Sequence, residues 1–163
     1  MKKATIWKYR LRDGLSWKAG IAPNFKQLPY DTVFFTDDHD RLWLSIGIDG
    51  TISIEPRYAW DGCSPKWQLG WLQFGTPDGA PNPVTGYPYT YAASCLHDAL
   101  LQWEDDPRMP YSRQQIDRIF YERLIMDGFP AATLYYKAVR FYSRWLDVKR
   151  VINIRTAIKK LLP

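Results

Sequence analysis

Apolar and polar residues alternate through much of the stretch from residue 5 to residue 54, and a period of two is typical of strands in an antiparallel sheet. The alternation is clearest in 5–11, a short apolar run follows in 32–35, and a further strand pattern covers 42–48. The last of these runs is followed by Asp49-Gly50 and then by a second short run, 51–54. Because an Asp-Gly pair supplies the positive φ angles of a type I′ turn, the pattern predicts a β-hairpin with that turn.

The period changes to three or four residues after Thr90, which predicts helices. The first predicted helix covers 89–103, contains neither Gly nor Pro, and places Ala93, His97 and Leu101 on one line. A second helix is predicted from the capping box Ser112-Arg113-Gln114-Gln115 to a stop at Gly128. A third should begin at Pro130, because proline is well tolerated in a first turn.

Gly and Pro are dense between these two halves, with several Trp among them, so we expect an irregular loop region in 57–89 that walls a pocket. The whole chain, 1–163, is then predicted to form a single α+β domain with an N-terminal antiparallel sheet and a C-terminal helical half. Its parts are a strand-rich region, the loop region, a helical region and a basic amphipathic tail helix: 1–56, 57–89, 90–146 and 147–163.

His97 is the residue of the first helix with the clearest chemical interest. Its line on the helix is otherwise apolar, so the ring should point inward, while Asp98 should lie at the edge of the buried face, toward an opening. Asp117 lies on or near the packed face of the second helix, and the short connection with two prolines predicts that the helices are antiparallel neighbours. We therefore expect the Asp117 carboxylate within hydrogen-bond reach of the His97 ring.

Two interpretations of these three residues are open. In one, His97 is a general base, Asp117 orients it and Asp98 is a second carboxylate, which is the arrangement needed to activate water against an ester or phosphoester. In the other, His97 and Asp117 are a buried hydrogen-bonded pair that only fixes the packing of two helices.

The composition of the chain permits an anionic partner but does not require one. Aromatic residues make up 16% of the chain, and the formal net charge is +5 with a pI near 9.2. Lys137, Arg140 and Arg144 form a helical stripe bordered by Tyr136 and Trp145, which is suited to an anion such as a nucleotide, a nucleic acid or a membrane surface. Alternatively, the stripe only solvates its helix or pairs with carboxylates elsewhere in the chain.

The remaining polar clusters favour structural roles. Cys63 and Cys95 lack the spacing of a metal-binding pair, and we expect both to be buried and reduced. The acidic stretch 37–40 lies between two predicted strands, which favours an ordinary turn over a metal site. The start of the chain has no apolar core of a signal peptide, and no run reaches the length of a membrane span.

Three motifs occur in a distinctive order. They are Tyr58-Ala59-Trp60-Asp61-Gly62-Cys63-Ser64-Pro65, then Ala92-Ala93-Ser94-Cys95-Leu96-His97-Asp98, then Arg113 to Asp117 with Phe120, Gly128 and a Tyr/Arg-rich helix. This order resembles the phage and prophage family known as domain of unknown function 1353, whose activity is not established. The resemblance covers 54–145 and departs at Leu101, where a Tyr is expected. It implies a phage or prophage protein, located in the host cytoplasm or in the virion.

The His-Asp pair, followed twenty residues later by an Asp, is also similar to the calcium-dependent secreted phospholipases. That similarity implies His97 as base, Asp117 as its orienter and Asp98 as ligand of a calcium-like cation, with backbone carbonyls of 60–64 completing the shell. The disulfides and the glycine-rich calcium loop of those enzymes have no counterpart here. The loop residues predicted to bind a ligand are Trp60, Asp61, Gly62 and Ser64.

Two function classes therefore stay open. The chain is a phage-type accessory hydrolase acting on an ester or phosphoester, or a non-enzymatic phage protein. The second class includes a virion component and a binder or inhibitor of a host molecule, such as an anionic nucleotide ligand. An anionic ligand or a phage or host protein is the expected partner, and nucleic acid is compatible with the charge.

Overall fold

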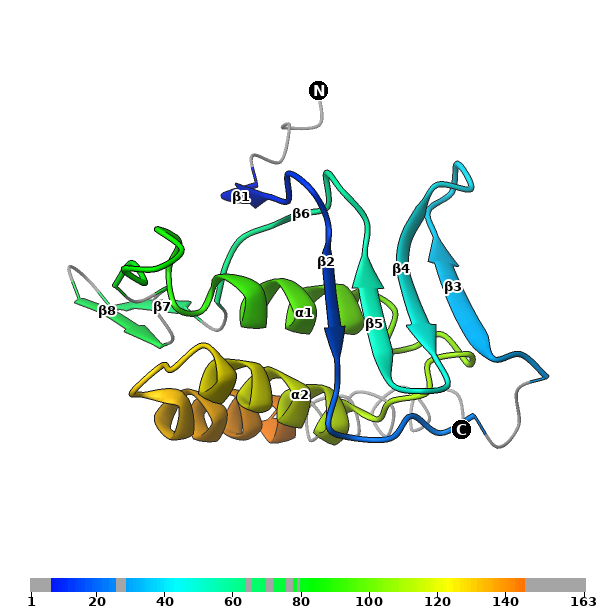
Figure 1. Cartoon of the computed structure of the whole chain (residues 1–163). Helices are drawn as coiled ribbons and strands as arrows, with labels where there is room; N and C mark the ends of the chain where they lie inside the picture. The colour runs from blue at the N-terminus through cyan, green and yellow to red at the C-terminus, as the bar shows by residue number, and fades with distance from the viewer. Residues whose placement is uncertain are drawn as a thin grey trace, which may run out of the picture.

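The computed structural model describes residues 7–25, 29–63, 66–69, 72–75, 78 and 80–145. Antiparallel strands come first and helices follow, which confirms the predicted α+β class (Figure 1). In the described part of the chain, no helix is both long and apolar enough to cross a membrane. The predicted tail helix, 147–163, lies outside the described residues.

The main sheet has four antiparallel strands in the order β2-β5-β4-β3. The predicted hairpin is present, with Ser45 of β4 opposite Ser53 of β5. The predicted turn type is wrong, because Gly50 has a φ of 84° while Asp49 is not among the described residues with positive φ. Asp49 instead accepts the Thr51 N–H at 3.0 Å. The strands are β2 (Leu15–Lys18), β3 (Thr32–Thr36), β4 (Leu42–Gly47) and β5 (Thr51–Ile54).

The segment 57–89 is more regular than predicted. β6 (Ala59–Trp60) pairs with β1 (Tyr9–Arg10), and β7 (Lys66–Leu69) pairs with β8 (Leu72–Gly75). Aromatic residues favour extended pairing, so Trp among the prolines marked short strands rather than loop. The N-terminal strand is also shorter than predicted: in the described part of 5–11, only β1 is a strand.

The described part of the C-terminal half contains three helices: α1 (Tyr91–Gln102), α2 (Arg113–Met126) and a third helix that covers 132–145. The capping box is present, because the Ser112 and Gln115 side chains each bind the other's backbone N–H. Gly128 ends α2 as predicted, with a φ of 72°, and the Phe129 N–H bonds to the Leu124 carbonyl.

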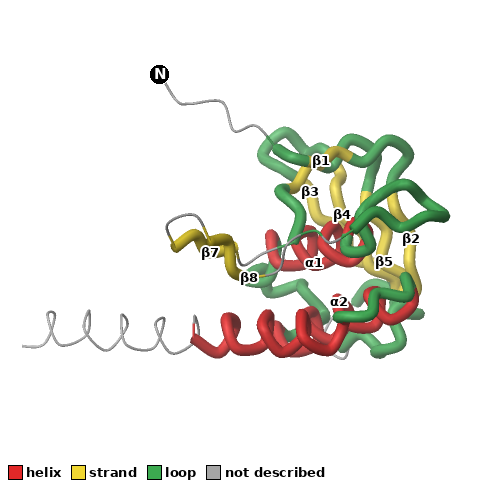
Figure 2. Tube along the Cα trace, turned by 90° about the vertical axis from the view of Figure 1, so that its left-hand side faces the viewer, coloured by secondary structure: helices red, strands yellow, loops and turns green. Residues whose placement is uncertain are grey.

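Two hydrophobic clusters share α1 and α2. The first joins the sheet to the helices and includes Phe35, Leu44, Ile52, Leu96, Leu100 and Ile116. The second joins the third helix to them and includes Ala93, Phe120, Leu124, Tyr135 and Val139. Figures 1 and 2 show that α1 lies against the sheet. The helix α2 and the third helix lie along the other side of α1. Each fully buried Leu, Ile or Phe contributes about 1.5–3 kcal/mol, so α1 is held from both sides.

Candidate functional site

His97 and Asp117 meet between α1 and α2. His97 Nε2 lies 2.9 Å from Asp117 Oδ1, and the two side chains are 7% and 0% exposed. Phe120 packs on the imidazole, with the ring centroids 5.1 Å apart. The predicted hydrogen bond is therefore present, because the inward faces of two adjacent helices bring the two residues together.

Asp117 also holds the third helix. Arg140 Nη1 donates to Asp117 Oδ2 at 2.8 Å. Arg113 lies one turn before Asp117, with its Nε 3.7 Å from Asp117 Oδ1. The Arg113 guanidinium also donates to Ser143 Oγ at 3.3 Å and to Glu104 Oε2 at 2.5 Å. One buried carboxylate thus connects α1, α2 and the third helix.

The pKa of the Asp117 carboxyl lies below its usual value. Burial alone would raise this pKa, because it removes water from the charged form. The hydrogen bond and charge interaction with His97, and hydrogen bonds from Arg140 and Ser143, outweigh that effect. Asp117 is therefore an anion at neutral pH and a counter-charge for the groups around it.

The second ring nitrogen of His97 reaches the surface. Within the described residues, Nε2 is the one ring atom with a hydrogen bond, and no buried side-chain nitrogen or oxygen lacks a partner. Nδ1 is therefore not fully buried, and it belongs to the small exposed part of the side chain. Because anionic Asp117 can only accept, Nε2 carries the proton in the neutral ring, and Nδ1 carries the lone pair that a general base needs.

The His97 side chain is only 7% exposed. Three hollows, of about 510, 350 and 170 Å³, are lined by described residues, and His97 lines none of these three. A molecule that meets Nδ1 must do so through the small exposed part of the ring.

Asp98 lies on a different side of α1 from His97. It falls between Ser94 and Gln102 on one line of the helix. Ser94 Oγ accepts the Trp60 indole N–H at 3.0 Å, and Gln102 Oε1 accepts the Tyr58 hydroxyl at 3.1 Å. Burial first and the Asp98 charge second raise the pKa of Tyr58. The half-buried Asp98 is therefore on the β6 side of α1 and does not converge with Asp117 on the ring.

The loop 60–64, predicted to bind a ligand, is partly buried in the core. Trp60 is 1% exposed and its indole is bound to Ser94, so its ring offers no surface to a ligand. Asp61 is exposed, and its Oδ1 accepts the Lys8 backbone N–H at 3.3 Å. Ser64 lies outside the described residues.

Asp78, which sequence reasoning missed, organises this loop. Its Oδ1 accepts the Cys63 N–H at 2.9 Å, and its Oδ2 accepts the Tyr9 hydroxyl at 3.2 Å and pairs with the Lys8 ammonium. Gly62, with a φ of 81°, lies so close that a Cβ there would collide with the carboxylate. Asp78 stands among prolines and glycines with no periodicity, so no sequence pattern indicated these contacts.

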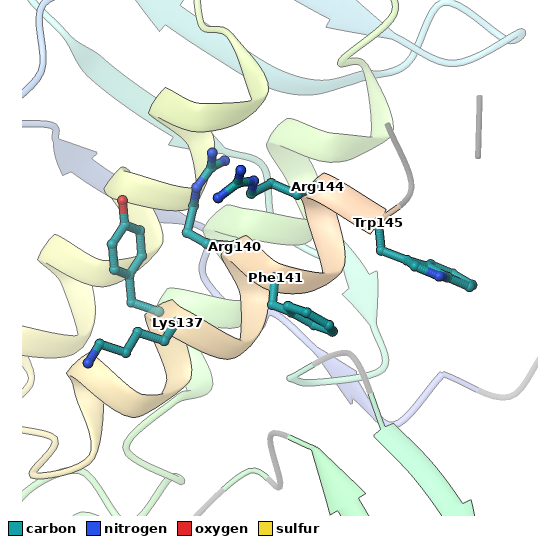
Figure 3. Close-up of a pocket in the computed structure, with 6 residues that line it drawn as sticks. Lys137, Arg140, Phe141, Arg144 and Trp145 are labelled. Carbon is teal, nitrogen blue, oxygen red and sulfur yellow. The ribbon is translucent and has the colours of Figure 1, made fainter. Parts of the chain in front are cut away.

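The three residues of the predicted basic stripe have different environments. Lys137 and Arg144 are exposed, whereas the Arg140 side chain is 24% exposed and bound to Asp117. Arg140 therefore takes the alternative role, pairing with a carboxylate elsewhere. In Figure 3 the guanidinium groups of Arg140 and Arg144 lie toward α2, while Phe141 and Trp145 point the other way. These four residues, with Tyr136 and Lys137, line the hollow of about 510 Å³.

Sequence reasoning also missed Arg113, Glu104 and Ser143. The signal for Arg113 was available, because it stands four residues before Asp117 and such pairs are neighbours on a helix. Glu104 and Ser143 come from other elements, so only the packing of the helices brings them to Arg113.

The acidic segment 37–40 is a turn, as predicted. Asp37 Oδ1 accepts the N–H groups of His39 and Arg41 at 2.9 and 3.1 Å, and its Oδ2 accepts the Trp43 indole at 2.8 Å. Across the described residues, no three His, Cys, Asp or Glu side chains gather in a way that could hold a metal. Calcium binding at Asp98 stays a prediction, and no step proposed below depends on a metal.

Cys63 and Cys95 are both buried, as predicted, and no disulfide joins them. Burial first and the Asp98 charge second raise the pKa of the Cys95 thiol. A buried thiol with a raised pKa is a poor nucleophile, so Cys95 has a packing role.

Comparison of the chain with protein-family models, with curated proteins and with solved structures gave no match. The resemblance to the phage family therefore stays a prediction from the three motifs.

Proposed function

We propose that His97 is a general base oriented by Asp117, in a phage-type accessory protein that hydrolyses an ester or phosphoester. The observation that carries the proposal is the bond between Nε2 and the buried Asp117 carboxylate, which leaves the lone pair of Nδ1 at the surface. A water bound to Nδ1 gives up a proton to it as its oxygen attacks the carbonyl carbon or the phosphorus. The leaving alcohol then takes that proton, and the imidazolium in between is stabilised by Asp117.

Two arginines make the surroundings suited to an anionic substrate. The side chains of Arg113 and Arg140 are 21% and 24% exposed and belong to the same network as Asp117. Their field attracts a phosphoester and opposes repulsion by Asp117. This favours a phosphoester over a neutral ester.

The test uses the two histidines of the chain as a matched pair. Hydrolysis of p-nitrophenyl butyrate and of bis-p-nitrophenyl phosphate is measured for wild type, His97→Ala, Asp117→Asn and His39→Ala. We expect His97→Ala and Asp117→Asn to lower the rate by about 100-fold or more. The first variant loses the general base, and the second loses the carboxylate that fixes the tautomer of His97. His39 lies in an exposed turn, so His39→Ala should keep the rate.

Circular dichroism separates a chemical effect from unfolding. A folded His97→Ala variant with the wild-type rate would contradict the proposal, as would a wild type that hydrolyses neither compound. In those cases the second function class gains weight.

A specific observation favours that second class, a non-enzymatic phage protein that binds a host molecule or belongs to the virion. Both Asp117 oxygens are bound within the protein, and three helices depend on them. In that case the hydrogen bonds of Asp117 have a structural role and hold the three helices together. An anionic ligand then binds elsewhere, at the hollow of the third helix. His97→Ala would then lower the melting temperature and leave ligand binding unchanged at temperatures where the variant is folded.

A further inference from the structure

The third helix has a second apolar side that faces outward. Leu134, Phe141 and Trp145 are 67%, 69% and 44% exposed. Their spacing of seven and four residues places them on one line of the helix, about 16 Å long. The opposite side carries the buried residues Ala132, Tyr135, Val139 and Ser143. The helix is therefore apolar on two sides, and the described core uses one of them.

Two cations lie along one edge of this line, on the side of Arg140. Lys137 and Arg144 are exposed, and within the described residues neither has an ion pair, in contrast to Arg140. Lys137 stands four residues before Phe141, and Arg144 directly precedes Trp145. The outer face, defined here as Leu134, Lys137, Phe141, Arg144 and Trp145, thus combines large apolar side chains with positive charge along one edge, where the Arg144 guanidinium lies on the side toward α2 (Figure 3). The formal net charge of the chain, +5, has the same sign.

We propose that the outer face docks on an anionic lipid bilayer, with its apolar line inserted at the level of the headgroups. A helix that presents Trp, Phe and Leu beside Lys and Arg has the composition of interfacial helices. The indole suits this depth because its ring is apolar and its N–H is polar. The two cations are complementary to anionic headgroups.

A bilayer fits this surface better than a nucleotide or a nucleic acid. The described residues that line the hollow at this position all come from one helix. Leu134 has no ring on which a base could stack, yet it is among the most exposed residues of the line. A flat lipid surface needs only one face, and it uses all three apolar side chains.

Docking in this way leaves the buried network untouched. Arg140 donates to Asp117 on the inner side, and Val139 and Tyr135 stay in the core. Substitutions on the outer face therefore test the membrane without disturbing the His97 site, and either proposal can fail alone.

The test is co-sedimentation of the full chain with vesicles of phosphatidylcholine mixed with phosphatidylglycerol, and with phosphatidylcholine alone. We expect binding to the anionic vesicles only. An apolar variant, Leu134→Gln with Phe141→Gln and Trp145→Gln, should lose at least about tenfold in affinity. Lys137→Gln with Arg144→Gln should lose about fivefold per charge at low salt, and less at moderate salt.

The matched control replaces three exposed apolar residues elsewhere, Phe34→Gln, Ile48→Gln and Val84→Gln, which are 54%, 54% and 90% exposed. It should bind like wild type. The proposal is overturned if wild type does not bind anionic vesicles, or if the control loses as much as the apolar variant. It is also overturned if light scattering shows a dimer that only the apolar variant dissociates, or if the variant loses binding to single-stranded oligonucleotide instead.

Discussion

Asp117 and Asp78 are both buried carboxylates, 0% and 8% exposed, but they are bonded in different ways. Asp117 lies among helices and binds side chains, including the His97 ring and the Arg140 guanidinium. Asp78 lies beside β1 and β6 and binds the Cys63 backbone N–H and side chains of the N-terminal segment. A buried charge must be paired and hydrogen-bonded wherever it lies, so burial alone does not distinguish the two.

The difference lies in the partners. One partner of Asp117 is the His97 imidazole, whose second nitrogen reaches the surface. The hydrogen bond to Asp117 therefore sets the tautomer of a ring that can exchange protons. The bonds of Asp78 tie a glycine turn to a strand. We therefore expect changes at Asp117 to affect both stability and chemistry, and changes around Asp78 to affect stability alone.

The largest effect should come from Asp117→Ala. It leaves Arg140 and His97 without their shared buried partner, and breaking such a pair costs about 3–5 kcal/mol. Urea denaturation followed by circular dichroism measures the free energy of unfolding. A loss below about 1 kcal/mol would show that Asp117 is not the residue that locks the three helices.

Gly62→Ala should come next, with a loss of about 2–3 kcal/mol. The new Cβ meets the Asp78 carboxylate at a φ that only glycine adopts easily. Gly86→Ala is the control, because Gly86 has a similar φ of 72° and open space around it. The difference in Tm between the two variants separates the contacts of the new Cβ with Asp78 and Tyr9 from the backbone strain. Equal losses would mean that backbone strain alone acts at Gly62, and that Asp78 does not hold the turn closely.

Arg140→Gln and Arg144→Gln test whether the two arginines of the basic stripe contribute differently to stability. Arg140 donates a charged hydrogen bond to a buried acceptor, and its removal should cost about 1.5–3 kcal/mol. Arg144 is exposed, and its removal should change stability by less than about 0.5 kcal/mol. Chemical denaturation of both variants measures the contrast. Equal effects would refute the assignment of the two arginines to opposite roles.

The smallest predicted effect is on the pH dependence of stability. The pKa of Asp117 is lowered in the folded state, so the folded protein binds fewer protons there than the unfolded chain. Its contribution is therefore complete above the unfolded pKa of about 3.9 and is lost as pH falls through the folded pKa. The Tm of wild type should drop more steeply with acid than that of Asp117→Asn. Parallel curves would show that other carboxyls dominate acid unfolding.

Local patterns determined much of the fold. The α+β order, the β4–β5 hairpin, the capping box at Ser112 and the stop at Gly128 follow from residues that are close in sequence. The bond between His97 and Asp117 was also predictable, because two inward faces joined by a short connection leave few arrangements. The type I′ turn failed because the same Asp-Gly pair suits a loop in which only glycine has a positive φ.

Tertiary structure alone decided the direction of Arg140, the pairing of β1 with β6 and the contacts of Asp78. Helical spacing placed Arg140 beside Lys137 and Arg144, but the rotation of the third helix against α2 turned it toward Asp117, 23 residues away. Tyr9 and Asp78 are 69 residues apart and share no periodicity. Periodicity defines which residues of one element share a face, and it contains no information on which distant charge that face will meet. Arg140 pairs with Asp117 because a buried carboxylate must be neutralised. Asp117 becomes buried only when the helices pack, so the sequence pattern alone does not indicate this pairing.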